Sequence, residues 1–399
     1  MRSDLSVSAV VAGLIAVIVS YAGPSVIIFQ AASAAHIDQA QLSSWIWAVS
    51  IGSGVSAIAL SLWFRAPVIT AWSTPGAALL VAALPNFGYA EAIGAFLFAA
   101  VAITALGASG LFDTIMSRIP RTIAAAMLAG ILFRFGSQIF VSFIAEPALV
   151  GTMFLAYLAL KRLLPRYAIA LVLSLGVAIA AGTGSLHFEN FHVELARPQW
   201  VQPEFSLTAI VGLGVPLALV TLTGQFVPGI AVLRASGYAT PANPLVWVTS
   251  GLSILLAPFG AHGVNLAAIT AAICSGPEAH HEAGKRYVAG VALGVFYIAI
   301  GAFGATLAAL FAALPKELIA AVAGLALLGA IMNGLSAAMS DEKEREPALV
   351  TFLVTASGAS FLGLGSAFWG LAIGILASLV LVPRPVRLAA VPELAERRT

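Results

Sequence analysis

Apolar stretches follow one another from near the start of the chain to near its end, and this pattern constrains the fold more than any other feature. Only 9% of the 399 residues are charged, whereas a soluble globular protein has about 25%. In hydrocarbon every backbone polar group needs a partner inside the protein, so the apolar stretches are expected to be helices. The sequence therefore predicts an all-α membrane protein, with the lipid bilayer as its solvent and without a separate soluble domain.

Hydropathy, interrupted by proline and glycine, divides the chain into fourteen expected membrane segments. The first is too long for a cleavable signal peptide, so we expect it to be a membrane helix. The expected spans are 7–35, 41–64, 67–84, 90–109, 120–143, 147–163, 167–183, 206–232, 243–257, 258–275, 287–312, 316–337, 347–363 and 365–382.

The basic residues test this count, because cytoplasmic loops of membrane proteins are enriched in Lys and Arg. With the N-terminus in the cytoplasm, all 19 Lys and Arg residues lie inside except Arg134, Arg197 and Lys316. This predicts a multi-pass protein of the bacterial inner membrane with both termini in the cytoplasm. Arg134 falls within the fifth segment, where we expect it to reach the outer interface or to pair with Glu146; a third role, attracting anions, is left out of the predicted site.

The second half of the chain resembles the first. The stretch "IPRTIAAAMLAGILF" at 119–133 is similar to "LPKELIAAVAGLALL" at 314–328, and "EPALV" occurs at 146–150 and again at 346–350. Each half contains an odd number of expected segments, so the second half crosses the membrane in the opposite sense. This predicts a 7+7 inverted repeat, as in many secondary transporters; chance similarity between alanine-rich helices is the alternative.

The third segment does not read as a simple membrane helix. Residues 67–72 follow a proline and are rich in β-branched side chains, which favours an extended strand. Thr74 is a natural N-cap and Pro75 suits the first helical position, where its missing N–H costs nothing. The helix that follows reaches about Leu84, roughly half the ~20 residues that a full span needs. We therefore expect a short strand followed by a half-helix that starts near mid-membrane.

The tenth segment shows the same design. "APFGAHG" at 257–263 is rich in glycine, and Asn265 is expected to cap a helix from Leu266 to Ser275, in the position equivalent to Thr74. Inverted symmetry would point the two half-helix N-termini towards each other. Each end carries free N–H groups and about +0.5 of an elementary charge, so together they predict an anion site that suits a carboxylate.

Two of these stretches carry a family resemblance. "AWSTPGAALL" at 71–80 and "APFGAHGVNLAAITAAICSGPEAHH" at 257–281 resemble signature stretches of the benzoate membrane transport family, BenE, and the similarity extends over nearly the whole chain. That family is similar in fold to the uracil permeases and the sulfate-permease-type anion transporters. The resemblance implies benzoate:proton symport. It also implies a core domain formed by 1–110 and 205–312 and a gate domain formed by 111–204 and 313–399.

Nucleobase permeases of this fold carry glutamates in the eighth and tenth segments. In this chain Gln225, His262 and Asn265 occupy that neighbourhood. Since the ring N–H groups of a nucleobase favour a carboxylate acceptor, the difference argues against a nucleobase cargo.

Side chains beside the broken segments are the candidates for binding. Gln225 can donate to a carboxylate and Tyr21 can donate or stack on a ring; hydrogen bonding between helices is the alternative for both. Trp72 and Phe226 can line a ring pocket, although membrane aromatics are more often packing or interface residues. The candidate substrate-binding residues are Tyr21, Trp72, Ser73, Thr74, Pro75, Gly76, Gln225, Phe226, His262, Gly263, Asn265 and Leu266.

His262 is the candidate for proton coupling. It is the titratable side chain expected in the broken tenth segment, and imidazole changes charge near neutral pH. A neutral histidine that hydrogen-bonds to backbone in an irregular turn is the alternative. A carboxylate entering alone would move against an inside-negative potential, at about 2.3 kcal/mol per charge per 100 mV. One accompanying proton removes that cost, so we expect symport.

Other functions remain open. The same fold can carry a nucleobase, sulfate or an aliphatic acid, or act as a passive anion channel; an intramembrane enzyme is disfavoured because clustered nucleophile and acid–base motifs are absent from the sequence. The P-loop pattern needed for ATP drive is also absent from it. The expected partners are a small aromatic carboxylate, a proton and lipid. We expect no nucleic acid, metal or cofactor, and a homodimer is left open.

Overall fold

The computed structural model is built almost entirely of helices, and it describes residues 4–116, 120–165, 167–186, 193–267, 269–277, 279–359, 361–362 and 366–382. Within these residues, eight helical stretches are long and apolar enough to cross a membrane. They are Val7–Ala34, Gln39–Phe64, Tyr89–Ala108, Arg121–Ala145, Leu207–Arg234, Ala242–Phe259, Ala283–Ala302 and Lys316–Ala338. The predicted polytopic, mostly helical membrane protein is confirmed.

In the first half, the described residues form one short strand among helices. Its elements are α1 (Val7–Ala22), α2 (Pro24–Ala34), α3 (Gln39–Phe64), β1 (Thr70–Trp72), α4 (Thr74–Ala83), η2 (Leu84–Asn86), α5 (Tyr89–Ala108), α6 (Phe112–Met116), α7 (Arg121–Ala145), α8 (Pro147–Leu163) and α9 (Ala168–Gly182).

The part of the second half that the structure describes also contains one short strand. Its elements are α10 (Leu207–Ala209), η3 (Ile210–Gly214), α11 (Val215–Thr221), η4 (Leu222–Phe226), α12 (Val227–Ala235), α13 (Ala242–Leu256), η5 (Ala257–Phe259), β2 (Val264–Leu266), α14 (Ile269–Ser275), η6 (Ala283–Lys285), α15 (Tyr287–Ala302), α16 (Gly304–Ala312), α17 (Lys316–Ala338), η7 (Glu342–Glu344), α18 (Arg345–Ser357) and α19 (Ser366–Leu381).

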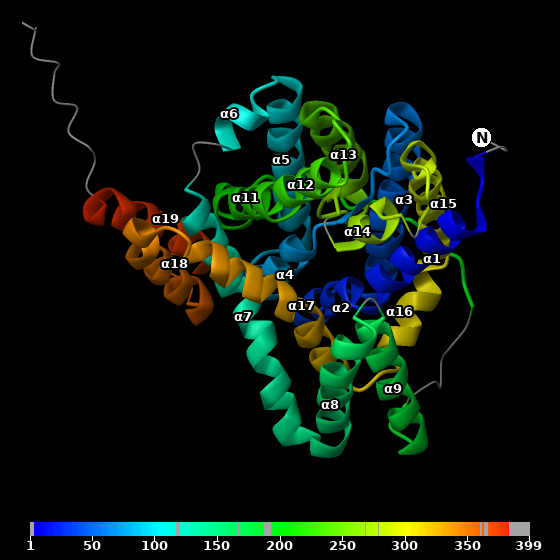
Figure 1. Cartoon of the computed structure of the whole chain (residues 1–399). Helices are drawn as coiled ribbons and strands as arrows, with labels where there is room; N and C mark the ends of the chain where they lie inside the picture. The colour runs from blue at the N-terminus through cyan, green and yellow to red at the C-terminus, as the bar shows by residue number, and fades with distance from the viewer. Residues whose placement is uncertain are drawn as a thin grey trace, which may run out of the picture.

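The helices form two sets, which Figure 1 shows on different sides of the molecule. In one set α17 packs along α7, α18 packs on α7 and α19, and α8 packs on α9. In the other set α3 packs on α15 and α13 packs on α5, with α1 beside α15. Contacts of α2 with α17 and of α4 with α7 join the two sets. We call them the α7–α17 set and the α3–α15 set.

Small residues allow the closest helix crossing in the α3–α15 set. A Cβ added at Gly54 of α3 would lie 2.6 Å from the carbonyl oxygen of Gly294 in α15, and one at Gly294 would lie 2.5 Å from the carbonyl oxygen of Gly54. In a membrane, where lipid tails are as apolar as side chains, such close backbone packing drives helix association.

Two further segments are interrupted for local reasons. The first breaks at Gly23, before Pro24, which starts α2 without needing an N–H donor. The helical stretch Leu207–Arg234 instead contains two π-helical turns, η3 and η4, just before Pro216 and Pro228. Proline cannot donate to the preceding turn, and a π-turn accommodates the missing bond without ending the helix.

The two strands pair antiparallel in the interior of the α3–α15 set, with Thr70 opposite Leu266, Ala71 opposite Asn265 and Trp72 opposite Val264. Each strand leads towards a short helix, α4 and α14, as predicted. The ladder is extended at both ends, because Ala267 N–H donates to Ile69 O and Ser73 N–H donates to Gly263 O. The predicted extended stretch before a half-helix is therefore present in both segments.

Both predicted caps are wrong. Asn265 is the middle residue of β2, and α14 begins only at Ile269, so a helix from Leu266 capped by Asn265 does not form. The backbone groups of 263–267 bond to 69–73 across the ladder, which excludes helical bonding there. In the third segment Ser73, and not Thr74, is the N-cap: its hydroxyl accepts from Gly76 N–H at 3.0 Å.

Candidate functional site

Ser73 is the residue at which the two broken segments meet. Its hydroxyl hydrogen-bonds to the hydroxyl of Thr221 at 2.9 Å as well as capping α4. Its carbonyl accepts from His262 at 3.0 Å. Its N–H donates to Gly263 O at 3.2 Å. One residue thus links the start of α4, the turn before β2 and the helix that carries Thr221.

Gln225 bridges the start of α4 and the end of β2. In the orientation that satisfies both of its polar atoms, the carboxamide oxygen accepts from Thr74 N–H at 3.2 Å and the nitrogen donates to Leu266 O at 3.1 Å. Asn265, oriented in the same way, accepts from Ser73 N–H and donates to Leu266 O, both at 3.2 Å. The N-terminal amide of α4 is therefore held by a neutral oxygen in a position that an anion can take.

Pro75, Gly76 and Phe226 complete the packing around this junction. A Cβ added at Gly76 would lie 2.7 Å from a methyl group of Leu217, so only glycine lets α11 approach α4 this closely. One added at Gly224 would lie 3.1 Å from the ring of Pro75, and Phe226 is fully buried. These predicted residues fit packing roles at the site.

His262 is buried, and both ring nitrogens are used. Nδ1 accepts from the indole N–H of Trp45 at 2.9 Å, and Nε2 donates to Ser73 O at 3.0 Å. This arrangement needs the neutral tautomer with its proton on Nε2. A proton can be accepted at Nδ1 only after the bond from Trp45 breaks, so the role of His262 in coupling stays a prediction.

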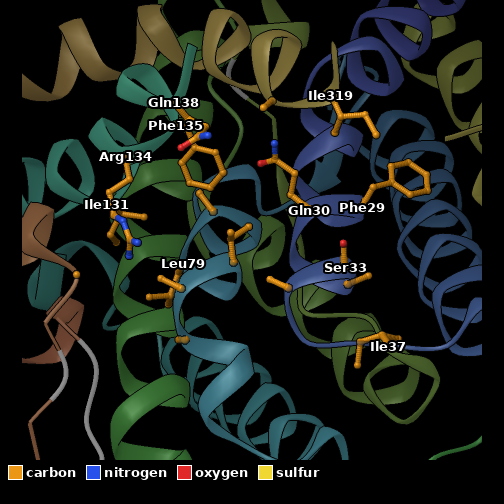
Figure 2. A pocket seen from close by; sticks show the side chains of 18 of the residues that line it. Phe29, Gln30, Ser33, Ile37, Leu79, Ile131, Arg134, Phe135, Gln138 and Ile319 are labelled. Atoms are coloured by element: carbon orange, nitrogen blue, oxygen red, sulfur yellow. The ribbon is translucent and has the colours of Figure 1, made fainter. Parts of the chain in front are cut away.

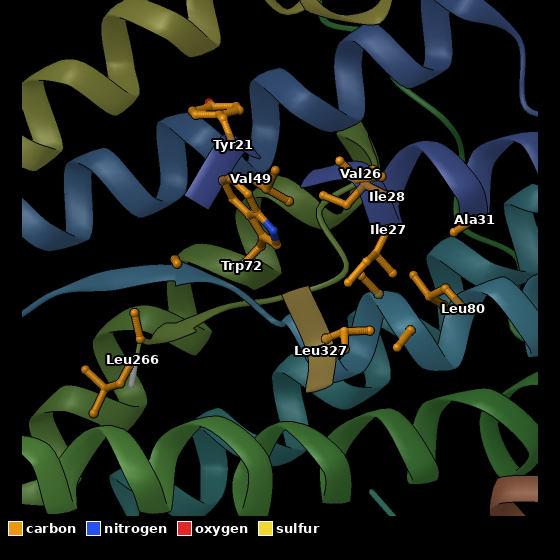
Figure 3. Close-up of a cluster of buried hydrophobic side chains, with 14 of the residues drawn as sticks. Tyr21, Val26, Ile27, Ile28, Ala31, Val49, Trp72, Leu80, Leu266 and Leu327 are labelled. Atoms are coloured by element: carbon orange, nitrogen blue, oxygen red, sulfur yellow. The ribbon is translucent and has the colours of Figure 1, made fainter. Parts of the chain in front are cut away.

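Tyr21 and Trp72 belong to a buried aromatic cluster with Tyr297. The ring centroids lie 5.3 Å apart for Tyr21 and Trp72, 5.9 Å for Tyr21 and Tyr297, and 5.7 Å for Trp72 and Tyr297. Figure 3 shows Tyr21 and Trp72 side by side in the interior. The Tyr21 hydroxyl bonds to that of Ser50. The buried indole N–H of Trp72 has no hydrogen-bond partner among the described residues, so it is a donor available to a ligand.

The junction is closed in this conformation. A void of about 10 Å³ lies beside Phe226, His262 and Gly263, which is room for one water molecule at most. The structure therefore brings the predicted residues together without providing space for a substrate among them.

A much larger cavity, of about 960 Å³, lies between the two sets of helices. Figure 2 shows Gln30 and Ser33 of α2 on one side and Arg134, Phe135 and Gln138 of α7 on the other. The cavity runs along Leu79 of α4 but does not reach Thr74, so it is separate from the closed junction.

Arg134 is not among the residues predicted for the site, and pairing with Glu146 was one of its expected roles. Arg134 makes no ion pair with any residue that the structure describes, and its side chain lines the large cavity. A cation within a membrane segment was the signal that could have found it.

Comparisons with known proteins agree with this architecture. The family model described as "Benzoate membrane transport protein", BenE, matches residues 3–380. A relative from Acinetobacter baylyi, described as a benzoate membrane transport protein, is 48% identical over 382 residues, 96% of this chain and 97% of the relative. The inner membrane protein YdcO of Escherichia coli is 44% identical over 370 residues, 93% of this chain and 95% of YdcO.

Solved structures with a similar fold are membrane transporters of low sequence identity. The overall structure of SLC26A9 aligns with a TM-score of 0.62 at 13% identity, covering 96% of this chain and 66% of that chain. The transmembrane domain of the cyanobacterial bicarbonate transporter BicA aligns with a TM-score of 0.55 at 16% identity, covering 94% of this chain and 96% of BicA's. At these identities the likeness concerns the fold alone.

Proposed function

Because the chain belongs to the BenE family of benzoate membrane transport proteins, we propose that it imports benzoate, or a closely related aromatic carboxylate, together with a proton. The observation that carries the proposal is the match, over nearly its whole length, with a relative described as a benzoate membrane transport protein. The chain is a membrane transporter and not an enzyme, so the cargo, its direction and its coupling are what the proposal adds.

The substrate carboxylate takes the place of the Gln225 oxygen at the start of α4. Thr74 N–H already donates to a side-chain oxygen there, and the partial positive charge of the helix end favours a full negative charge over a neutral amide. The indole N–H of Trp72 is a further donor without a partner in the described structure. Binding at this junction requires it to open, since the void beside it is small.

Opening is a movement of one set of helices relative to the other. The α3–α15 set then corresponds to a core domain (1–110 and 205–312), and the α7–α17 set to a gate domain (111–204 and 313–399). The pairing of α3 with α15 and of α5 with α13 supports a 7+7 inverted repeat of fourteen segments, because a two-fold axis in the membrane plane exchanges these pairs. In this arrangement both termini lie in the cytoplasm.

Uptake into proteoliposomes tests the coupling. Radiolabelled benzoate is offered at neutral outer pH with an alkaline interior, where the substrate outside is almost entirely ionised. We expect accumulation that a protonophore abolishes. Protein-free vesicles correct for benzoic acid that crosses the bilayer unaided. Uptake that ignores the imposed gradient, while remaining above the protein-free level, excludes proton symport.

His262→Gln tests the proton-coupling residue. Glutamine keeps a donor for Ser73 O and an acceptor for Trp45 but does not titrate. If His262 carries the proton, the variant exchanges labelled for unlabelled benzoate at close to the normal rate but no longer accumulates it under a pH gradient. Normal gradient-driven accumulation assigns the proton to another group, including the substrate itself.

An inorganic anion is the second candidate cargo, since one structural neighbour is described as a bicarbonate transporter. Competition separates the candidates. Unlabelled benzoate should block labelled benzoate uptake, while bicarbonate, sulfate, uracil and short aliphatic acids at the same concentration should not.

A further inference from the structure

The large cavity between the two sets of helices has an unusual charge. Among the described residues that line it, Arg134 and Lys316 are basic and none is Asp or Glu. The other polar side chains include the amides of Gln30 and Gln138, which Figure 2 shows facing each other across the opening. A cavity whose charged groups are all positive attracts anions into it.

Arg134 is the cation placed deepest along a helix in this lining. It stands near the middle of α7, where inserting a charged side chain into the membrane is costly. Its side chain forms no ion pair or hydrogen bond with any residue that the structure describes. Such a charge in a membrane segment calls for a compensating ligand or a functional reason.

The fold offsets part of that charge. The guanidinium lies against Gly358, because a Cβ added to this residue would be 2.5 Å from its Nη1. Gly358 is the C-cap of α18 and has a φ of +67°, so the guanidinium faces the negative end of a helix dipole. The dipole orients Arg134 without neutralising it, which leaves its donors available in the cavity.

The surroundings of Arg134 suit a planar ring attached to a carboxylate. Gln138 is one turn further along α7 and lines the same cavity, so it adds an amide donor to the wall that carries Arg134. Phe135 and Ile131 line the same wall, and Phe29 stacks on Phe311 at 3.9 Å elsewhere in the lining. The cavity thus combines a forked cation, an amide and aromatic surface.

We propose that Arg134 and Gln138 form a second binding site for an aromatic carboxylate, in a vestibule that the substrate occupies before it reaches the start of α4. The inference rests on the proposed function for the identity of the ligand. In the proposed topology the vestibule opens to the outside. Both carboxylate oxygens of benzoate accept hydrogen bonds from the guanidinium, and its ring packs against Phe135.

Equilibrium binding of radiolabelled benzoate to purified protein tests this site. The wild-type chain should bind two molecules, and Arg134→Gln should lose one of them or bind it at least about tenfold more weakly, as expected for a lost charge-assisted hydrogen bond. The affinity of Arg134→Lys for this second molecule should lie between those of wild type and Arg134→Gln, because lysine keeps the charge but not the paired donors of the guanidinium. Benzamide, a neutral analogue of the same shape, should not displace benzoate from the Arg134 site.

Lys343→Gln is the matched control, since it removes one positive charge from the exposed segment η7, away from the cavity lining. It should bind as the wild type does. If Arg134→Gln does not give a folded protein by size-exclusion chromatography, Gln138→Leu tests the same site from a cavity-facing position, with the same expected loss.

The outcomes separate this inference from the proposed function. The same isotherm for wild type and Arg134→Gln, whether it shows one site or two, overturns the vestibule site while gradient-driven uptake still supports transport. No binding and no uptake of benzoate by the wild type overturns both.

Discussion

At the scale of single residues, Gln225 occupies the position that matters most for the proposed cargo. It touches both broken segments, accepting from Thr74 N–H and donating to Leu266 O. A neutral amide can do both, whereas a carboxylate can only accept. The residue therefore satisfies the N-terminal amide of α4 when no substrate is bound, and in the proposed function the substrate carboxylate displaces its oxygen.

Gln225→Glu supplies that anion permanently. The new carboxylate accepts from Thr74 N–H and repels a second carboxylate, so we expect benzoate uptake to fall by at least about tenfold. The measurement is initial uptake into proteoliposomes. Gln202→Glu, in an exposed part of the chain, is the control with the same chemical change. Uptake by Gln225→Glu that equals that of the control would place the substrate elsewhere.

Asp4 gives a pH-dependent prediction outside the membrane segments. Its carboxylate accepts from the Tyr287 hydroxyl at 2.8 Å and from Arg65 at 3.0 Å, and the bond from Tyr287, with the charge of Arg65, lowers the pKa of Asp4. A lowered folded-state pKa contributes stability above the unfolded value of about 3.9, and this is lost as pH falls below it.

Asp4→Asn should therefore lower the melting temperature of the detergent-solubilised protein at neutral pH, and the difference from wild type should shrink as pH falls below about 4. Thermal unfolding across pH measures it. Asp38→Asn is the matched control, because asparagine replaces aspartate as the N-cap of α3 at little cost. A difference that is constant across pH would contradict the role of the Asp4 charge.

At the scale of elements, the crossing of α3 and α15 depends on two glycines that leave no room for a methyl group. Gly294→Ala should destabilise the protein by about 1–3 kcal/mol, since an added Cβ meets backbone that cannot move aside cheaply. Reversible unfolding in mixed detergent gives the difference in free energy. Gly329→Ala in α17, where an added Cβ meets nothing within 4 Å, should have little effect. Equal effects of the two changes would show that the close approach does not limit stability.

The broken segments show what could be predicted from sequence and what could not. The strand and half-helix at β1–α4 follow from local chemistry, because a proline at the start of a helix and a hydroxyl residue before it act over a few residues. The place where α14 begins does not, because residues 263–267 pair with 69–73, almost 200 positions away in the chain. Asn265 has a good capping side chain, but the ladder decides its conformation.

Arg134 shows the same limit. Its charge was visible in the sequence, but the cavity beside it is formed by α2, α4, α7 and α17 together, and its orientation depends on the C-terminal end of α18. None of these neighbours is close in sequence. Pairing with Glu146 was the local expectation, and the structure replaces it with contacts that come from packing.

At the scale of the whole molecule, the two sets of helices meet around the cavity and along the contacts of α2 with α17 and of α4 with α7. If transport requires these sets to move past each other, a covalent link across the cavity must stop it. Gln30 and Gln138 face each other there from α2 and α7 (Figure 2). Cysteines at these two positions can be joined by a flexible bifunctional reagent that forms a disulfide with each thiol.

We expect the linked Gln30→Cys/Gln138→Cys protein to lose nearly all benzoate uptake and to regain it when a reductant cleaves the link. The background is Cys274→Ala, because Cys274 is the one native cysteine and is buried. The control pair is Phe140→Cys/Phe154→Cys, two positions within the α7–α17 set whose native rings lie 5.7 Å apart. Linking these two cysteines leaves the relative movement of the two sets intact. Undiminished uptake after complete linking across the cavity would mean that the sets stay fixed, and that the substrate reaches the start of α4 through local opening alone.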